Sequence, residues 1–279
     1  GNETPMAGFL NFKLGDLLRE RNNFRLAEQY LTLGLDQSQY LGQPDILVDA
    51  TICCGRFQLA IGDLDQARYY FQKSKEIAEK TKVDPWISCW LTDLQIRIWS
   101  SEENWDAINH WINTCGLSFD QPLSYQHDLN HQNLARAYIA RASLSTADKI
   151  EGSVSQLLDK LLFAAKLAGW VHEQIEILIM EAISLQIQGD SQKALKPLIE
   201  AVVLAEPGGY QRVFIDEGER MHTLLGQLEK LIRIGDLTML NLVKEYANQD
   251  HVESIKKYIH FLFKAFIRTK PQLESTAYQ

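Results

Sequence analysis

Apolar positions recur along the chain at the spacing of amphipathic helices, and no run of residues shows the alternation that a strand requires. Four of these helical patterns follow a proline, a residue favoured at the first helical position because no N–H is needed there. These prolines are Pro5, Pro44, Pro85 and Pro122. Asp84 precedes one of them as a candidate N-cap. The pattern predicts an all-α chain.

A small residue returns at a spacing of 40, at Ala27, Ala67 and Ala107, each time after a polar turn such as Gly62-Asp63. The pattern occurs again at Gly189-Asp190 before Ala194. Glycine ends one helix and aspartate caps the next. Other small residues stand earlier in the unit (Gly15, Gly55, Ala182), and large apolar ones follow (Leu31, Phe71, Trp111, Leu198). The spacing predicts helical hairpins that cross closely at small side chains.

These units resemble the tetratricopeptide repeat (TPR), with a period near 40 instead of about 34. We expect five hairpins over residues 1–205, stacked as a right-handed solenoid. Residues 206–279 are expected to form a helical C-terminal cap and a linker. Within the cap, the stripe of Ile255, Tyr258, Ile259, Leu262, Phe263 and Phe266 indicates a closing helix. A domain-docking face and a membrane-surface helix are the alternatives.

A more specific signal lies between Leu204 and Gly218. It reads Ala205-Glu206-Pro207-Gly208-Gly209-Tyr210-Gln211-Arg212-Val213-Phe214-Ile215-Asp216-Glu217-Gly218. This run resembles the end of the helical-repeat region in large LuxR/MalT-type bacterial transcriptional regulators. The resemblance implies a cytoplasmic sensing region that binds a small-molecule inducer or a regulatory protein. It also implies a neighbouring ATPase domain and a helix-turn-helix DNA-binding domain, neither of which this sequence contains.

Composition excludes several other classes of function. The formal net charge of −8 argues against direct nucleic-acid binding by this chain. The sequence has no apolar run of the roughly 20 residues that cross a bilayer, so no membrane association is expected. A phosphate-binding loop and a nucleophile elbow are missing, so we expect neither a cofactor nor catalysis. The four cysteines include no CxxC pair, which favours buried thiols.

One pair of residues raises the question of a metal site. His127 and His131 stand at i and i+4, as metal ligands do in HExxH enzymes. No third ligand accompanies them, and Asp128 replaces the glutamate base. We therefore interpret them as two surface histidines of a repeat helix and predict no metal site.

The candidate binding surface is the concave face, which the first helix of each hairpin should line. Its predicted residues are Phe12, Asp16, Arg19, Asp49, Arg56, Thr92, Trp99, Gln132, Arg136, Glu176 and Gln186. Five of the six tryptophans lie within 26 residues, and Trp99 is the one expected to face a ligand. The alternative is a stand-alone TPR adaptor for protein–protein interaction, in which Arg19, Arg56 and Arg136 bind an acidic peptide.

Overall fold

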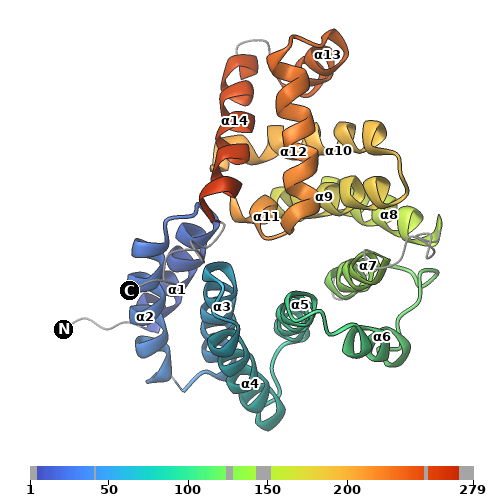
Figure 1. Ribbon diagram of the computed structural model, residues 1–279. Helices are drawn as coiled ribbons and strands as arrows, with labels where there is room; N and C mark the ends of the chain where they lie inside the picture. Colours follow the sequence, from blue (N-terminus) through green and yellow to red (C-terminus); the bar gives the residue numbers. More distant parts are fainter. Residues whose placement is uncertain (1–4, 41, 124–127, 143–151, 248–250, 270–279) are drawn as a thin grey trace, which may run out of the picture. The chain divides into compact units, whose positions relative to one another are not determined.

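The computed structural model describes residues 5–40, 42–123, 128–142, 152–247 and 251–269, and every regular element within them is helical (Figure 1). The all-α prediction is confirmed over these ranges. The elements are α1 (Pro5–Glu20), α2 (Phe24–Gln39), α3 (Pro44–Ile61), α4 (Leu64–Lys80), α5 (Pro85–Ser101), α6 (Trp105–Thr114), α7 (Asp128–Ala142), α8 (Gly152–Ala168), α9 (Val171–Ile187), α10 (Ser191–Ala205), η1 (Glu206–Gly208), α11 (Arg212–Ile215), α12 (Gly218–Arg233), α13 (Leu237–Tyr246) and α14 (Val252–Thr269).

The chain divides into two compact units, residues 1–164 and 165–279, and the division falls inside α8. In unit 1, the hairpins α1–α2 and α3–α4 are followed by α5, α6 and α7, and successive first helices α1, α3, α5 and α7 are in contact. In unit 2, α9 and α10 form a hairpin that α12, α13 and α14 contact. The expected boundary at 205 coincides with the end of α10, and the assignment of domains stays a prediction.

Turn chemistry explains where the hairpins bend. Gly62 ends α3 in the left-handed conformation at φ 85°, which an L side chain rarely adopts. The Asp63 side chain then accepts a hydrogen bond from the Gln66 N–H at 3.0 Å and caps α4. Asn104 caps α6 and Asp190 caps α10 in the same way. The predicted caps Asp63 and Asp190 are confirmed.

Asp84 behaves differently from the cap that the sequence suggests. It occupies the N-cap position of α5, but its side chain makes no capping hydrogen bond to the backbone. Instead, its carboxylate accepts from the indole N–H of Trp86 at 3.3 Å. Pro5, Pro44 and Pro85 begin their helices as expected, whereas Pro122 lies in a non-helical stretch ahead of α7.

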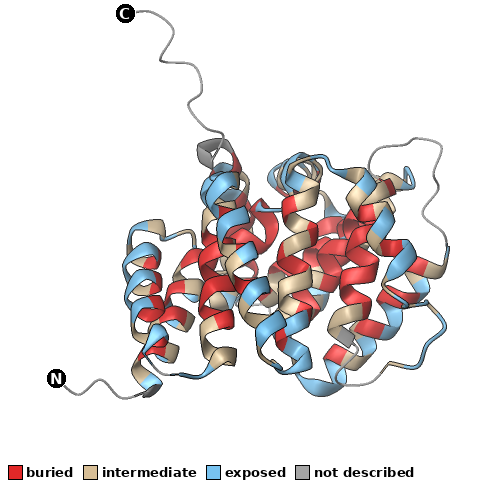
Figure 2. Ribbon diagram, turned by 90° about the horizontal axis from the view of Figure 1, so that it is seen from below, coloured by how far each residue is buried: buried red, intermediate tan, exposed pale blue. Residues whose placement is uncertain are grey.

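Small residues set the distance between helices. A Cβ added at Gly34 of α2 would lie 2.4 Å from the backbone nitrogen of Phe12, and one at Gly15 would lie 2.7 Å from Leu31. Ala27 and Ala67 are fully buried at the equivalent crossings. Figure 2 shows that buried residues follow the helix faces turned toward neighbouring helices, while the outward faces are exposed. The close crossings predicted from the repeat are therefore present.

Candidate functional site

The first helices of unit 1 place charged side chains next to one another. Ion pairs join residues of α1, α3, α5 and α7, although these helices are separated in the sequence by their hairpin partners. We call this group the first-helix ladder. Its members are Lys13, Asp16, Arg19, Glu20, Asp49, Arg56, Asp93, Arg97 and Arg136.

Asp93 is the carboxylate on which three arginines converge. Its oxygens lie 3.0 Å from Arg56 Nη2, 3.0 Å from Arg97 Nε and 3.2 Å from Arg136 Nε. These cations belong to α3, α5 and α7, so one carboxylate connects three first helices. Burial alone would raise the pKa of Asp93, but Arg97, Arg136 and Arg56 outweigh it and hold that pKa well below its usual range.

Asp16 extends the ladder toward the first helix. Arg19 Nε lies 2.7 Å from its carboxylate, and Arg56 Nη1 lies 3.8 Å away. Burial would raise the pKa of Asp16, yet the two arginines lower it to about 2. Asp16 is therefore ionised at neutral pH.

Lys13 of α1 and Asp49 of α3 form another pair of the ladder, with Lys13 Nζ 2.8 Å from the carboxylate of Asp49. The same ammonium lies 4.4 Å from the ring centroid of Trp90 and 5.4 Å from that of Phe12. Burial raises the pKa of Asp49, and the Lys13 charge only partly offsets this effect. Burial opposes the charge on Lys13, but its anionic neighbours prevail and raise its pKa. The pair combines an ion pair with cation–π contacts.

The other predicted residues of unit 1 lie in varied settings. Phe12 is fully buried in the core of the first hairpin and does not line an open surface. Trp99 is half-buried and packs against the cluster of Ile96, Ile108, Ile112 and Ala137. The Thr92 hydroxyl donates to the Ser88 carbonyl at 2.9 Å, and Gln132 is buried. None of these four residues belongs to the ladder.

Glu176 and Gln186 belong to α9 of unit 2. The Gln186 side-chain amide donates to the Arg220 carbonyl at 3.3 Å, and its Oε1 is buried without a hydrogen bond within the described residues. Glu176 is half-buried. Neither residue is assigned to the first-helix ladder.

Sequence analysis missed four ladder members, which are Lys13, Glu20, Asp93 and Arg97. A signal for two of them is present in the repeat, because Lys13 and Asp93 stand two periods of 40 apart. Cys53 and Asn133 fill the same register position in α3 and α7. Opposite charges at one register position indicate that this position faces a shared polar environment.

His131 is buried, at 1% exposure, and its Nε2 lies 3.2 Å from the Ser118 carbonyl. Its interpretation as a surface histidine was wrong, because this side of α7 packs against the stretch that follows α6. His127 lies outside the described residues. Within those residues, no group of three or more His, Cys, Asp or Glu side chains could hold a metal ion.

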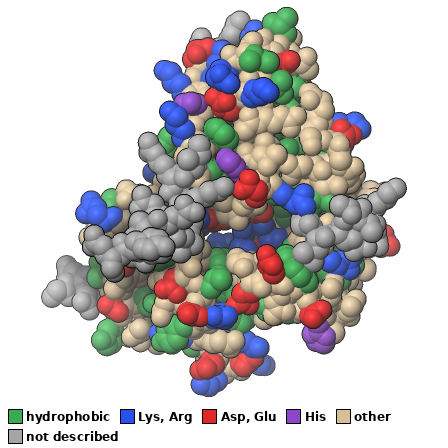
Figure 3. Space-filling model, viewed as in Figure 1, with side chains coloured by type: hydrophobic (Ala, Val, Ile, Leu, Met, Phe, Trp, Pro, Cys, Tyr) green, Lys and Arg blue, Asp and Glu red, His purple; other side chains and the backbone are tan. Residues whose placement is uncertain are grey.

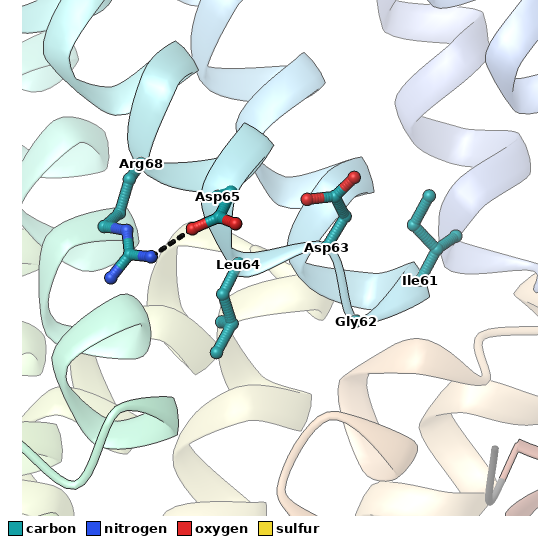
Figure 4. Close-up of a pocket in the computed structure, with 6 residues that line it drawn as sticks. All are labelled: Ile61, Gly62, Asp63, Leu64, Asp65 and Arg68. Atoms are coloured by element: carbon teal, nitrogen blue, oxygen red, sulfur yellow. Dashed lines mark hydrogen bonds and ion pairs between the residues drawn. The ribbon is translucent and has the colours of Figure 1, made fainter. Parts of the chain in front are cut away.

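A shallow hollow lies at the turn between α3 and α4 (Figure 4). It is lined by Ile61, Gly62, Asp63, Leu64, Asp65 and Arg68. Asp65 and Arg68 form an ion pair beside it, and Asp63 is occupied as the cap of α4. These groups satisfy the turn itself, so the hollow offers no set of convergent binding groups.

The distinctive segment after α10 has a structural role in unit 2. The Tyr210 carbonyl accepts a hydrogen bond from the Tyr258 hydroxyl, and Glu206 accepts one from Ser254. Both donors belong to α14, so this segment holds α14 in place through two side-chain hydrogen bonds. The apolar stripe of α14 is turned inward, with Ile255, Ile259 and Leu262 at 1%, 1% and 0% exposure, as expected for a closing helix.

The exposed positions of α14 combine basic residues with Glu253 and Phe261. Lys257, His260 and Lys264 are exposed there, and Figure 3 shows Lys, Arg and His side chains along this edge of unit 2. Because the apolar stripe is covered, it is not available to a lipid surface. None of the helices over the described ranges is both long and apolar enough to cross a membrane.

Stacked hairpins with small residues at their crossings define a TPR-like helical-repeat protein. The chain belongs to the family of MalT-like TPR regions, which it matches over residues 1–231. The resemblance drawn from the repeats and from residues 205–218 is confirmed. The hairpin array accounts for most of the matched length.

Two relatives are described as HTH-type transcriptional regulator MalT. The protein from Vibrio campbellii is 26% identical over 208 residues, which cover 72% of this chain and 22% of the relative. The protein from Vibrio cholerae is 26% identical over 271 residues, which cover 91% of this chain and 28% of the relative. The chain thus spans about a quarter of the length of the curated relatives it matches.

Proposed function

We propose that this chain is the signal-sensing region of a MalT-like transcriptional regulator and that its effector binds at the first-helix face of unit 1. The observation that carries the proposal is the first-helix ladder, which gathers polar groups from four helices. The match to MalT-like TPR regions supports the regulatory context. In this role the chain recognises a signal and has no catalytic step of its own.

Energetics support a recognition role for the ladder. Ion pairs removed from water cost desolvation free energy, and apolar residues of similar volume often stabilise a core equally well. Asp49 is 2% exposed and Arg136 is 7% exposed, so these charges carry that cost. Polar groups held rigidly by one another are suited to orient a hydrogen-bonding ligand, because little side-chain entropy remains to be lost on binding.

Effector binding can act as a switch only if the effector prefers one state of the regulator. A ligand with equal affinity for both states shifts no population, however tightly it binds. The ladder supplies a means for such a preference, since its ion pairs connect helices whose relative spacing a ligand can change. We therefore expect the bound effector to alter the spacing of α1, α3 and α5.

The first test is a thermal-shift screen of the chain against sugars, amino acids, nucleotides and short peptides. A ligand at about 100 times its dissociation constant adds roughly 2.7 kcal/mol. For a chain of this size, we expect a rise in Tm of about 5–10 °C. The dissociation constant of a ligand found in this screen is then measured by calorimetry for the Trp99→Phe and Trp105→Phe variants. Both tryptophans are half-buried and pack against the same cluster, but only Trp99 lies on a first helix.

Loss of binding in Trp99→Phe with retention in Trp105→Phe supports the proposed face. Equal binding by both variants contradicts it.

The adaptor function is tested by capture of an acidic peptide. Arg19, Arg56 and Arg136 already pair with carboxylates of the chain, so such a peptide has to displace those partners. Capture that is abolished by replacing all three with alanine, in a variant that keeps its helical spectrum, favours the adaptor.

A further inference from the structure

The outer side of the first hairpin carries an apolar stripe exposed to solvent. Met6 and Leu10 of α1 are each 58% exposed, Leu14 is 39% exposed and Leu17 is 37% exposed. Their spacing of four, four and three residues places them in one line along the helix. Leu33 of α2 adds a further side chain that is 46% exposed. We call these five residues the outer stripe.

The same register positions are covered in the second hairpin. Forty residues after the α1 members of the outer stripe stand Ile46, Ala50, Cys54 and Phe57 of α3. Ala50, Cys54 and Phe57 are 0%, 5% and 4% exposed, and Ile46 is partly buried. They share one core cluster with Phe12 of α1 and with Leu31 and Leu35 of α2. In the second hairpin, this face is therefore the contact with the preceding hairpin.

The third first helix repeats the contact. Leu94 of α5 stands 80 residues after Leu14, and it is fully buried. A Cβ added at Gly55 of α3 would lie 2.7 Å from the Leu94 side chain, so Leu94 packs against the preceding hairpin. Trp90, 80 residues after Leu10, also packs in the cluster shared by α3, α4 and α5. The α3 equivalents of the stripe, and the α5 equivalents of Leu10 and Leu14, thus lie in contacts with the preceding hairpin.

We infer that the outer stripe is a docking surface for a further helical hairpin of this repeat class, stacked in the 40-residue register ahead of α1. The repeat contacts identify the occupant, because the equivalent positions in α3, and two of them in α5, lie against the preceding hairpin. A second copy of the chain would place its own outer stripe against this one. It could not present the α1–α2 surface that α3 contacts, since α3 already covers that surface. Figure 2 shows the exposed outer side of this hairpin next to the start of the chain.

The experiment supplies such a hairpin within the chain. A duplicate of residues 4–43 is inserted directly ahead of Thr4, so that original Met6 stands 40 residues after its copy. Hydrogen exchange and thermal melting are then compared with the parent chain. Nearest-neighbour interfaces stabilise repeat arrays, so we expect Tm to rise by about 5 °C and the amides of original α1 to exchange at least about 10-fold more slowly.

The matched control carries Leu10→Glu and Leu14→Glu in the original α1, with the duplicate left intact. Both side chains are exposed in the parent chain, so the same pair of substitutions in the parent should leave Tm unchanged. The control should lose the gains in Tm and in protection from exchange.

The proposal is overturned if the inserted segment adds no helical signal, or if amide exchange in α1 is unchanged by the insertion. It is also overturned if light scattering shows that the parent is a dimer that Leu10→Glu dissociates, because the stripe then binds a second copy. This inference does not depend on the effector proposal.

Discussion

Arg56 of α3 and Asp93 of α5 lie 37 residues apart in the sequence, and Arg56 Nη2 is 3.0 Å from the Asp93 carboxylate. The other terminal nitrogen of Arg56 lies 3.8 Å from Asp16 of α1. One guanidinium thus contacts carboxylates on two first helices that are not sequence neighbours. This arrangement makes Arg56 the residue through which most of the first-helix ladder is connected.

Replacing Arg56 with Gln should destabilise unit 1. Asp93 keeps Arg97 and Arg136, but Asp16 loses one of its two cations, so we expect a loss of about 2 kcal/mol in the free energy of unfolding. Urea unfolding followed by circular dichroism measures it. Arg68→Gln is the control, because Arg68 pairs with Asp65 and Glu102 at the exposed surface. Equal stability losses in the two variants would contradict the importance assigned to Arg56.

Stability should depend on Asp16 in acid. The pKa of Asp16 in the folded chain, about 2, lies below its ordinary value of 3.8. The ionised carboxylate therefore stabilises the fold fully above that ordinary value, and the stabilisation is lost as the pH falls from 3.8 toward 2. Asp16→Asn should cost about 2 kcal/mol at pH 7 and much less near pH 2. Denaturant unfolding at several pH values measures the difference, and a difference independent of pH would contradict the assignment.

Gly34→Ala should disrupt the first hairpin. The added methyl group would lie 2.4 Å from the backbone nitrogen of Phe12, so α1 and α2 have to separate. We expect a loss of about 3 kcal/mol or more, measured by thermal and urea unfolding. Gly152→Ala provides the comparison, since a Cβ there meets nothing within 4 Å. A Gly34 variant as stable as the Gly152 variant would show that the crossing tolerates a wider spacing.

The packing of α14 against the segment that follows α10 should depend on Tyr258. Tyr258→Phe removes the hydroxyl that donates to the Tyr210 carbonyl, and we expect a loss of about 1 kcal/mol with faster amide exchange in α14. Ser254→Ala removes the neighbouring bond to Glu206. A double-mutant cycle then tests whether the two bonds form one unit. Unchanged exchange in α14 for both variants would show that apolar packing alone holds this helix.

Native cysteine reactivity should be confined to Cys115. Cys53, Cys54 and Cys89 are buried, and burial raises the pKa of Cys54 to about 12. Cys115 is half-buried. Because the thiolate is the reactive form, a thiol reagent should label one cysteine quickly in the folded chain and four after unfolding. Mass spectrometry of peptides identifies the labelled residue, and early labelling of Cys53 would contradict the packing of α3.

The fold could be predicted from the sequence wherever a local signal has one structural meaning. Gly62-Asp63 specifies a helix end followed by a cap, and the buried alanines specify close crossings, so the hairpins followed directly. The direction in which each side chain points was harder to predict from the sequence. Phe12 and Asp16 stand one helical turn apart, and repeat alignment placed both on the binding face, but only Asp16 joins the ladder.

Ion-pair partners depend on distances that the register alone does not give. Arg56 and Arg136 were selected from the repeat, whereas Asp93, which joins them, was not. Its apolar neighbours Leu94 and Ile96 make α5 look like a core helix, and the fully buried positions of both residues confirm that environment. Polar residues in such a segment are recognised as partners only when helices from different hairpins are seen together. His131 was misjudged for the same reason.

In a repeat array whose units touch only their neighbours, disorder in one unit raises the free energy of the adjacent ones and then fades with distance. Arg56 of the second hairpin pairs with carboxylates of both neighbours, Asp16 of the first hairpin and Asp93 of the third. Loosening the second hairpin therefore removes an ion pair from each of its two neighbours. The correlation length of fluctuations in unit 1 should accordingly extend over three hairpins, so that this stretch opens as a single cooperative segment.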